Sequence, residues 1–223
     1  MDEDNIALFD MDGTLVDYDT AMLADLESLR SDHEPPLTFE RMHDLPGPWE
    51  ARRKLIVQKP GWWLKLRPLE VGMWLFDQAL KVGFNPNILT KGPRHCPNAW
   101  KEKVEWCHQE LFRPELVKSR TTLTTPDELD IHVVSAKSLV YGKVLVDDFP
   151  PYVESWLRHR PRGLVLLPHY FYNRDFQHPN VVRCGDPTDS EWKKKARAAL
   201  ETAFFRRAGE PLVLDWRKKR CLI

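Results

Sequence analysis

This sequence has no charge excess, no long apolar run and no repeat. Lys plus Arg and Asp plus Glu are equal at 33 each, so no basic surplus exists to bind a nucleic-acid backbone. No apolar stretch approaches the roughly 20 residues needed to cross a bilayer. These absences argue against nucleic-acid polymers and membranes as partners. The 223 residues suffice for one full core with a modest insertion.

Cysteine is scarce, and no two cysteines form a C-x-x-C pair. A chain of this length does not need disulfides for stability, so we expect reduced thiols and a cytoplasmic location. The acidic N-terminus fits this expectation, because it leaves no room for a signal or transit peptide before the first predicted strand. A zinc site from His95-Cys96 and Cys107-His108 is an alternative that the spacing does not favour. The cysteines are Cys96, Cys107, Cys184 and Cys221.

Two carboxylates follow the first apolar segment. Ile6-Ala7-Leu8-Phe9 is typical of a strand buried on both faces, and Asp10-Met11-Asp12-Gly13 comes directly after it. Gly13 allows a sharp turn, so the carboxylates are expected at the carboxyl edge of a sheet, where ligands of α/β proteins bind. Acidic groups one residue apart indicate a hard divalent cation such as Mg²⁺. A solvated Asp-rich turn would give the same short pattern.

Apolar strands and amphipathic helices alternate along the chain, which predicts an α/β fold with a doubly wound, Rossmann-like parallel sheet. The last helix, 189–208 with Asp189 or Ser190 as its cap, either covers the sheet or mediates association, which leaves a homodimer open. The helix from Pro97 has an apolar stripe of Trp100, Val104, Cys107 and Leu111. The other expected strands are 87–89, 121–124, 131–134, 143–146 and 163–167, and the other helices are 19–30, 69–82 and 150–159.

Residues 18–67 have a different character from the rest. They consist of short helical pieces separated by 46–48 and 60–61, without strand-like alternation and with several aromatic residues. We interpret them as a small helical cap inserted after the first strand, lying as a lid over the carboxylates. The core then comprises residues 1–17 and 68–223, of which 189–223 are a C-terminal helix and tail.

Four polar features fall at the ends of predicted strands, and in order they resemble the four signatures of the haloacid dehalogenase-like (HAD) phosphohydrolases. The match covers about Ile6 to Leu167 and implies the HAD core fold, Mg²⁺ as cofactor and hydrolysis of a phosphate monoester through an aspartyl-phosphate. The features are Asp10 with Asp12, Thr90, a lysine near residue 140, and Asp147 with Asp148.

The resemblance implies a role for each residue. Asp10 is the nucleophile, Asp12 the general acid and base, and Thr90 a ligand of the phosphoryl oxygens. Mg²⁺ is held by the Asp10 carboxylate, the Asp12 backbone carbonyl and Asp148, with Asp147 alongside. Two lysines fit the third signature. We favour Lys137, because Lys143 lies inside a predicted strand.

A closer resemblance is to the 5′(3′)-deoxyribonucleotidases, which dephosphorylate nucleoside monophosphates. It implies a base pocket lined by Tyr18 and a phosphate neighbour at Lys103. Trp62 and Trp63 are looser candidates for base stacking and suit the core of the cap equally well. The residues that carry the resemblance are Leu66-Arg67-Pro68-Leu69, His95-Cys96-Pro97 and Lys103-Val104-Glu105-Trp106.

The sequence departs from that family at two positions. Thr14 stands where valine is usual, and Lys91 stands where serine usually follows the signature threonine. Lys91 either contacts a phosphate or is solvated. The alternatives are a phosphatase for a sugar phosphate or another small metabolite, and a HAD-fold binding protein without catalysis. The aromatic residues of the cap favour a nucleotide, and the complete set of acidic residues favours an enzyme.

Overall fold

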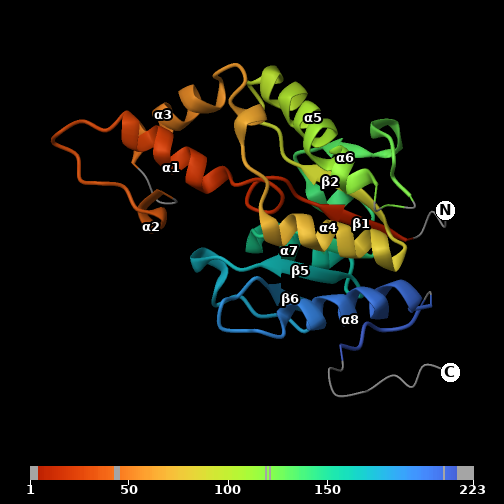
Figure 1. Ribbon diagram of the computed structural model, residues 1–223. Coiled ribbons are helices and arrows are strands. Elements are labelled where there is room, and N and C mark those ends of the chain that lie inside the picture. Colours follow the sequence, from red (N-terminus) through yellow and green to blue (C-terminus); the bar gives the residue numbers. More distant parts are fainter. Residues whose placement is uncertain (1–4, 43–45, 119, 121, 208, 215–223) are drawn as a thin grey trace.

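The computed structural model describes residues 5–42, 46–118, 120, 122–207 and 209–214. At its centre is a six-stranded parallel sheet of order β3-β2-β1-β4-β5-β6 (Figure 1). This is the order of a doubly wound Rossmann-like sheet, so the predicted α/β fold class is confirmed. The strands are β1 (Ile6–Phe9), β2 (Asn85–Thr90), β3 (Ile131–Val133), β4 (Val144–Val146), β5 (Leu164–Pro168) and β6 (Val181–Cys184).

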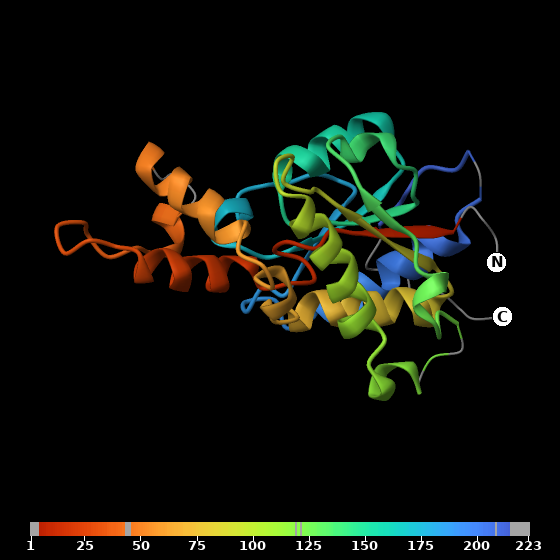
Figure 2. The same cartoon turned by 90° about the horizontal axis from the view of Figure 1, so that it is seen from above.

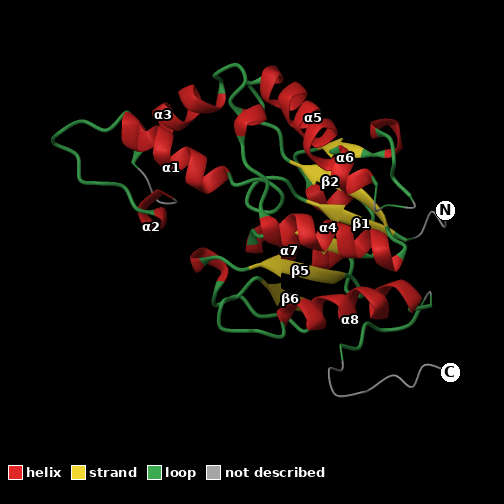
Figure 3. Cartoon of the chain, in the orientation of Figure 1, coloured by secondary structure: helices red, strands yellow, loops and turns green. Residues whose placement is uncertain are grey.

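Helices enclose the sheet on both faces, so its central strands consist almost entirely of apolar residues (Figure 3). Ala7 and Phe9 of β1 pack with the helices α4, α5 and α8, whereas Leu8 points to the other face and packs with α7. No helix among the described residues is both long and apolar enough to cross a membrane. These helices are α4 (Glu70–Val82), α5 (Pro97–Leu111), α7 (Pro150–His159) and α8 (Trp192–Phe205).

The described part of residues 18–67 is helical and contains no strand. It projects beyond the sheet on the side where β1 ends (Figures 1 and 2). Its two ends lie side by side, since the backbone N–H of Asp17 donates to the carbonyl of Arg67 over 2.8 Å. The division into cap and core stays a prediction. The helices of this part are α1 (Tyr18–Ser28), α2 (Phe39–Met42), α3 (Gly47–Val57) and the 3-10 turn η1 (Trp63–Lys65).

The remaining short helices lie in the connections that follow β2, β3 and β5. They are α6 (Pro114–Val117), η2 (Pro126–Glu128), η3 (Lys137–Leu139) and η4 (Phe171–Asn173).

Several boundaries differ from the prediction. Residues 122–124 form no strand, and Thr121 lies outside the described residues. The edge strand β6 was not predicted, because an arginine interrupts its short apolar run. Helix α3 begins at Gly47, so Pro48 stands in its first turn, where proline loses no hydrogen bond. Helix α8 begins at Trp192 with Glu191 as its N-cap, instead of Asp189 or Ser190.

The apolar stripe predicted for α5 is confirmed at Cys107 and Leu111, which are buried, but not at Trp100, and the buried face is wider than predicted. Trp100 is 40% exposed, and the buried face includes the charged residues Glu102 and Lys103 beside Ala99 and Trp106. Periodicity missed part of this face because it treated both charged residues as solvent-facing. Of the cysteines, Cys96, Cys107 and Cys184 are free and buried, whereas Cys221 lies outside the described residues.

Candidate active site

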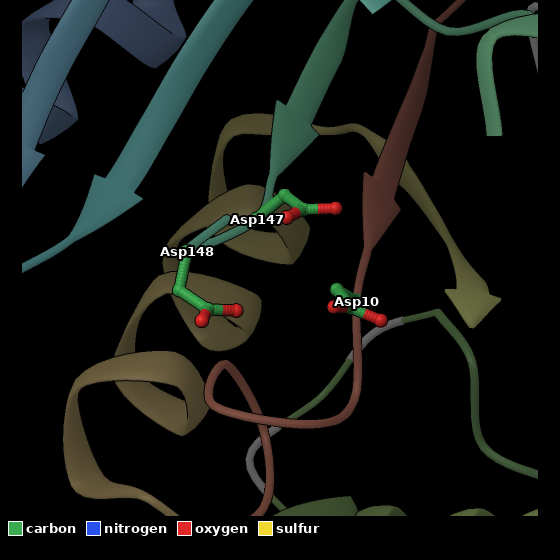
Figure 4. A group of neighbouring side chains, drawn as sticks. All are labelled: Asp10, Asp147 and Asp148. Atoms are coloured by element: carbon green, nitrogen blue, oxygen red, sulfur yellow. The ribbon is translucent and has the colours of Figure 1, made fainter. Parts of the chain in front are cut away.

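Three carboxylates meet where the strand order of the sheet reverses. Asp10 follows β1, and Asp147 and Asp148 follow the adjacent strand β4 (Figure 4). One oxygen from each lies within 4.8 Å of the others. Ligands of open α/β sheets bind at this crevice. Among the described residues this is the one cluster of three or more His, Cys, Asp or Glu side chains arranged to hold a metal ion, and the alternative zinc site is not formed.

Lys137, on η3, joins two of these carboxylates. Its Nζ lies 2.7 Å from Asp10 Oδ1 and 2.8 Å from Asp147 Oδ2, and the residue is buried. Burial acts to lower the pKa of Lys137, but the charges of Asp10 and Asp147 outweigh it and raise this pKa. Lys143 instead donates to Asn5 Oδ1 over 2.7 Å. Of the two candidate lysines, Lys137 is therefore the one that contacts these carboxylates.

A second buried lysine holds Asp12. Lys103 Nζ lies 2.6 Å from Asp12 Oδ2, 2.9 Å from Thr90 Oγ1 and 3.1 Å from the carbonyl of Lys91. An ammonium group has three N–H donors, and these contacts account for all of them. Lys103 is fully buried and is not part of the cavity wall, so it lies behind Asp12 and Thr90.

Asp148 is fixed by residues from two other segments. Thr14 Oγ1 donates to its Oδ1 over 3.1 Å, and the hydroxyl of Tyr172 donates to its Oδ2. Asn173 Nδ2 donates to its backbone carbonyl over 2.8 Å. Thr14 stands where the deoxyribonucleotidases usually have valine, and its hydroxyl makes a hydrogen bond to Asp148 that a valine could not make. Tyr172 and Asn173 were missed, although their place just after the carboxyl end of β5 was a usable signal.

The charges of the site do not balance. Asp10, Asp12, Asp147 and Asp148 face the ammonium groups of Lys103 and Lys137, which leaves two negative charges. Burial raises the pKa of Asp148 well above its ordinary value and that of Asp147 to about 6. Burial also raises the pKa of Asp12 in spite of Lys103, and its Oδ1 is buried without a hydrogen-bond partner among the described residues. One divalent cation with oxygen ligands would fit this donor set.

A cavity of about 760 Å³ opens above these carboxylates. Asp10, Asp12, Asp148 and Lys137 line it on the core side, and helices α1 and α3 contribute to the opposite side. It is far larger than a phosphate group, so it has room for the rest of a small organic substrate. Its aromatic wall comprises Tyr18, Trp63, Phe149, Tyr152 and Tyr172, and its cations include Arg53, Lys54, Lys91 and Arg94.

The predicted substrate-binding residues divide between the cavity and the interior. Tyr18 and Trp63 line the cavity, with their ring centroids 5.7 Å apart. Lys91 also lines it and donates to the hydroxyl of Tyr152 over 3.0 Å. Trp62 is not part of the cavity wall and donates through Nε1 to Asp25 Oδ2 over 2.6 Å, and both tryptophans are nearly buried, at 6% exposed for Trp62 and 3% for Trp63. Adjacent tryptophans thus face different surroundings.

No protein-family profile matches this sequence, and no curated protein matches it. By structure, the chain is similar to a candidate haloacid dehalogenase-like hydrolase from Burkholderia xenovorans LB400, with a TM-score of 0.44 and 16% sequence identity. The similarity covers 85% of this chain and 98% of that chain.

Proposed function

We propose that the protein is a HAD-like, Mg²⁺-dependent phosphomonoesterase that acts on nucleoside monophosphates, with deoxyribonucleotides as its first candidates. The observation that carries the proposal is the placement of Asp10. Its carboxylate stands at the reversal of the strand order, beside Lys137 and within 4.8 Å of Asp147 and Asp148, and it lines a cavity of about 760 Å³.

Asp10 is oriented in a way that suits a nucleophile. Its Oδ1 accepts from the backbone N–H of Met11 over 2.7 Å and lies 2.7 Å from Lys137 Nζ. Its Oδ2 has no hydrogen bond to the described residues. That oxygen is therefore left to attack a phosphorus atom in line with the leaving group, and the adjacent lysine attracts the anionic ester.

Thr90 and Asp12 both contact Lys103, and each has a proposed role in the reaction. The hydroxyl of Thr90 accepts from Lys103, which leaves its own proton to donate; Thr90 is fully buried and is not part of the cavity wall, so a phosphoryl oxygen would have to pass beyond that wall to accept it. Asp12 lines the cavity with a side chain that is 31% exposed, Lys103 holds its Oδ2, and its carboxyl group is the one that can protonate the leaving oxygen and later remove a proton from water.

Mg²⁺ fits the donor set of this site. Asp10, Asp148 and the Asp12 backbone carbonyl would hold it, and it would neutralise charge on the phosphoryl oxygens. Asp147 instead supports the ligands, because its oxygens are used by Lys137 and by the backbone N–H of Phe149 over 3.0 Å.

The nucleotide assignment rests on the cavity wall. Tyr18 lines the cavity and is partly exposed, and base stacking on such a residue contributes roughly 1 to 3 kcal/mol per base. Trp63 also lines the cavity but is only 3% exposed, so Tyr18 is the first candidate for stacking. The cations at the cavity, among them Arg53 and Lys91, would attract an anionic substrate.

Phosphate release tests the proposal. The wild-type protein is assayed with Mg²⁺ against ribo- and deoxyribonucleoside monophosphates and against common sugar phosphates, with EDTA as a control. We expect EDTA-sensitive release from nucleotides, and Asp10→Asn should abolish it. Release from sugar phosphates alone would reject the nucleotide assignment. No release from any compound would reject the enzyme and favour a binding protein.

A further inference from the structure

Helix α5 carries two charged residues side by side in the protein interior. Glu102 is 7% exposed and Lys103 is 0% exposed. Charged side chains are almost never buried unless they are paired or hydrogen-bonded, so each needs partners. The partners of the two residues belong to different parts of the molecule. Those of Lys103 are the site residues Asp12 and Thr90 with the carbonyl of Lys91, whereas those of Glu102 are backbone groups at the end of the helical segment 18–67.

Glu102 binds the backbone just before and within η1. Its Oε1 accepts from the N–H of Gly61 over 2.7 Å, and its Oε2 accepts from the N–H of Trp63 over 3.2 Å. Gly61 has φ of 76°, in the left-handed region that favours glycine, and this turn aims both N–H groups at one carboxylate. Hydrogen bonds to a charged acceptor are strong, so α5 holds this turn firmly.

Trp63 connects this turn to Lys103. Its indole ring lies 4.4 Å from Lys103 Nζ, a cation–π contact on an ammonium group that already uses its three donors. On its other edge, Trp63 Nε1 donates to the carbonyl of Val57, at the end of α3, over 3.0 Å. The same indole therefore contacts the lysine that holds Asp12 and the helix that lines the far wall of the cavity.

We infer that Glu102, Trp63 and Lys103 form one positioning unit that makes the alignment of Asp12 and Thr90 depend on how the turn at Gly61 is seated. Glu102 and Lys103 are not part of the cavity wall, so both are positioning residues and not catalytic ones. If the turn shifts, the indole shifts with it, and the ammonium group loses the ring that fixes it from one side. The inference rests on the proposed function, because alignment of Asp12 and Thr90 matters only for catalysis.

A double-mutant cycle on kcat tests the unit. Glu102→Gln keeps the size of the side chain but removes one acceptor and the charge. It should lower kcat by roughly 10- to 100-fold because Asp12 and Thr90 are no longer aligned, while KM stays within about twofold. Lys103→Met should lower kcat at least as much. Because the two residues act through one another, the double variant should be no slower than Lys103→Met alone. Effects that multiply in the double variant would overturn the inference.

Glu105→Gln is the matched control on the same helix. Glu105 pairs with Lys101 over 3.3 Å and has a side chain that is 38% exposed, so this change alters charge without touching the unit. It should leave kcat and KM unchanged. Thermal unfolding of each variant identifies any that fails to fold, and Lys103→Arg, which keeps the charge, then replaces Lys103→Met in the cycle.

A second measurement does not need turnover. The backbone amides of Gly61 and Trp63 should exchange their hydrogens roughly tenfold faster in Lys103→Met than in the wild type, as measured by NMR, although Lys103 bonds to neither amide. Unchanged exchange there would overturn the inference even if the enzyme is active. If the wild-type protein releases no phosphate but Lys103→Met still speeds exchange at Gly61 and Trp63, the proposed function is rejected. The inferred coupling between Lys103 and the turn at Gly61 is then retained.

Discussion

At the scale of single residues, the two lysines near position 140 give the sharpest comparison. Lys137→Ala leaves the buried carboxylates of Asp10 and Asp147 without their shared cation and removes a charge that, under the proposed function, would face the phosphoryl group. We expect activity to fall by roughly 10²- to 10³-fold. Lys143→Ala loses only a contact with Asn5, so its activity should stay close to that of the wild type. Initial rates of phosphate release measure both, and the reverse ranking would transfer the role to Lys143.

The sequence was sufficient to place side chains that directly follow a buried strand, while the roles assigned to them stay predictions. Asp10, Asp147 and Asp148 converge because parallel strands end at one edge of the sheet, a geometric consequence of the fold class. The sequence was not sufficient where the role depends on a contact from outside that edge. Nothing in the sequence shows that the hydroxyl of Thr14 reaches Asp148, or which of the adjacent residues Trp62 and Trp63 faces the cavity.

At the scale of elements, the turn η4 supports the carboxylates after β4. Tyr172→Phe removes the hydroxyl that donates to Asp148 but keeps the ring, which stacks on Tyr170 at 5.1 Å between centroids. Groups that orient a metal ligand typically contribute 10- to 100-fold in affinity, so the Mg²⁺ concentration for half-maximal activity should rise at least about 10-fold. Tyr170→Phe is the matched control and should leave this Mg²⁺ concentration unchanged. Equal effects of the two substitutions would contradict the assignment.

The loop between α1 and α2 is joined to α3 by an ion pair. Glu34, in this loop, accepts from Arg52 of α3 at 2.8 and 3.0 Å. This hydrogen bond, together with the backbone N–H of Ser31, lowers the pKa of Glu34 from 4.5 to about 2. A carboxyl whose pKa is depressed in the folded state stabilises the fold above its ordinary pKa, and this contribution is lost as the pH falls through the lower value.

The matching experiment follows the thermal unfolding of the wild type and of Glu34→Gln as the pH is lowered. Above pH 4.5 the wild type should be the more stable protein, and its advantage should shrink as the pH falls toward 2. Because neither Glu34 nor Arg52 lines the cavity, activity above pH 4.5 should change little. A difference in stability that does not vary with pH would show that the ion pair is not its source.

Elements were predicted well when their periodicity reflects burial alone. Helix α4 ends at Val82, as predicted, because the next residue, Gly83, takes the left-handed conformation that favours glycine, with φ of 108°. Helix α5 was misjudged because Glu102 and Lys103 are buried through specific hydrogen bonds that no hydrophobic pattern records. Strand β6 was missed because it lies at the edge of the sheet, where one side of the ladder is unpaired and an arginine is tolerated.

At the scale of the whole molecule, the fold brings together carboxylates that are distant in the sequence. Asp10 follows the first strand and Asp148 follows the fourth, and they become neighbours only because β1 and β4 are adjacent in the sheet. The alternation of strands and helices predicted the doubly wound parallel sheet, whereas the adjacency of β1 and β4 required the structure. The helical segment 18–67 was predicted from its lack of alternation, but its contacts with α5 required the structure.

Since the unfolded chain cannot assemble this site, Mg²⁺ should bind the folded protein selectively and stabilise it. A ligand present at 100 times its dissociation constant adds about 2.7 kcal/mol to the free energy of unfolding, so the unfolding temperature should rise with Mg²⁺ concentration. Asp148→Asn removes one expected ligand and should weaken this dependence, whereas Asp175→Asn, whose side chain is 92% exposed, should not.

The site carries two uncompensated negative charges, so Asp148→Asn should also be at least as stable as the wild type without Mg²⁺. Differential scanning fluorimetry measures both effects. An unfolding temperature that does not respond to Mg²⁺, or a response that Asp148→Asn leaves intact, would show that these carboxylates do not hold the metal.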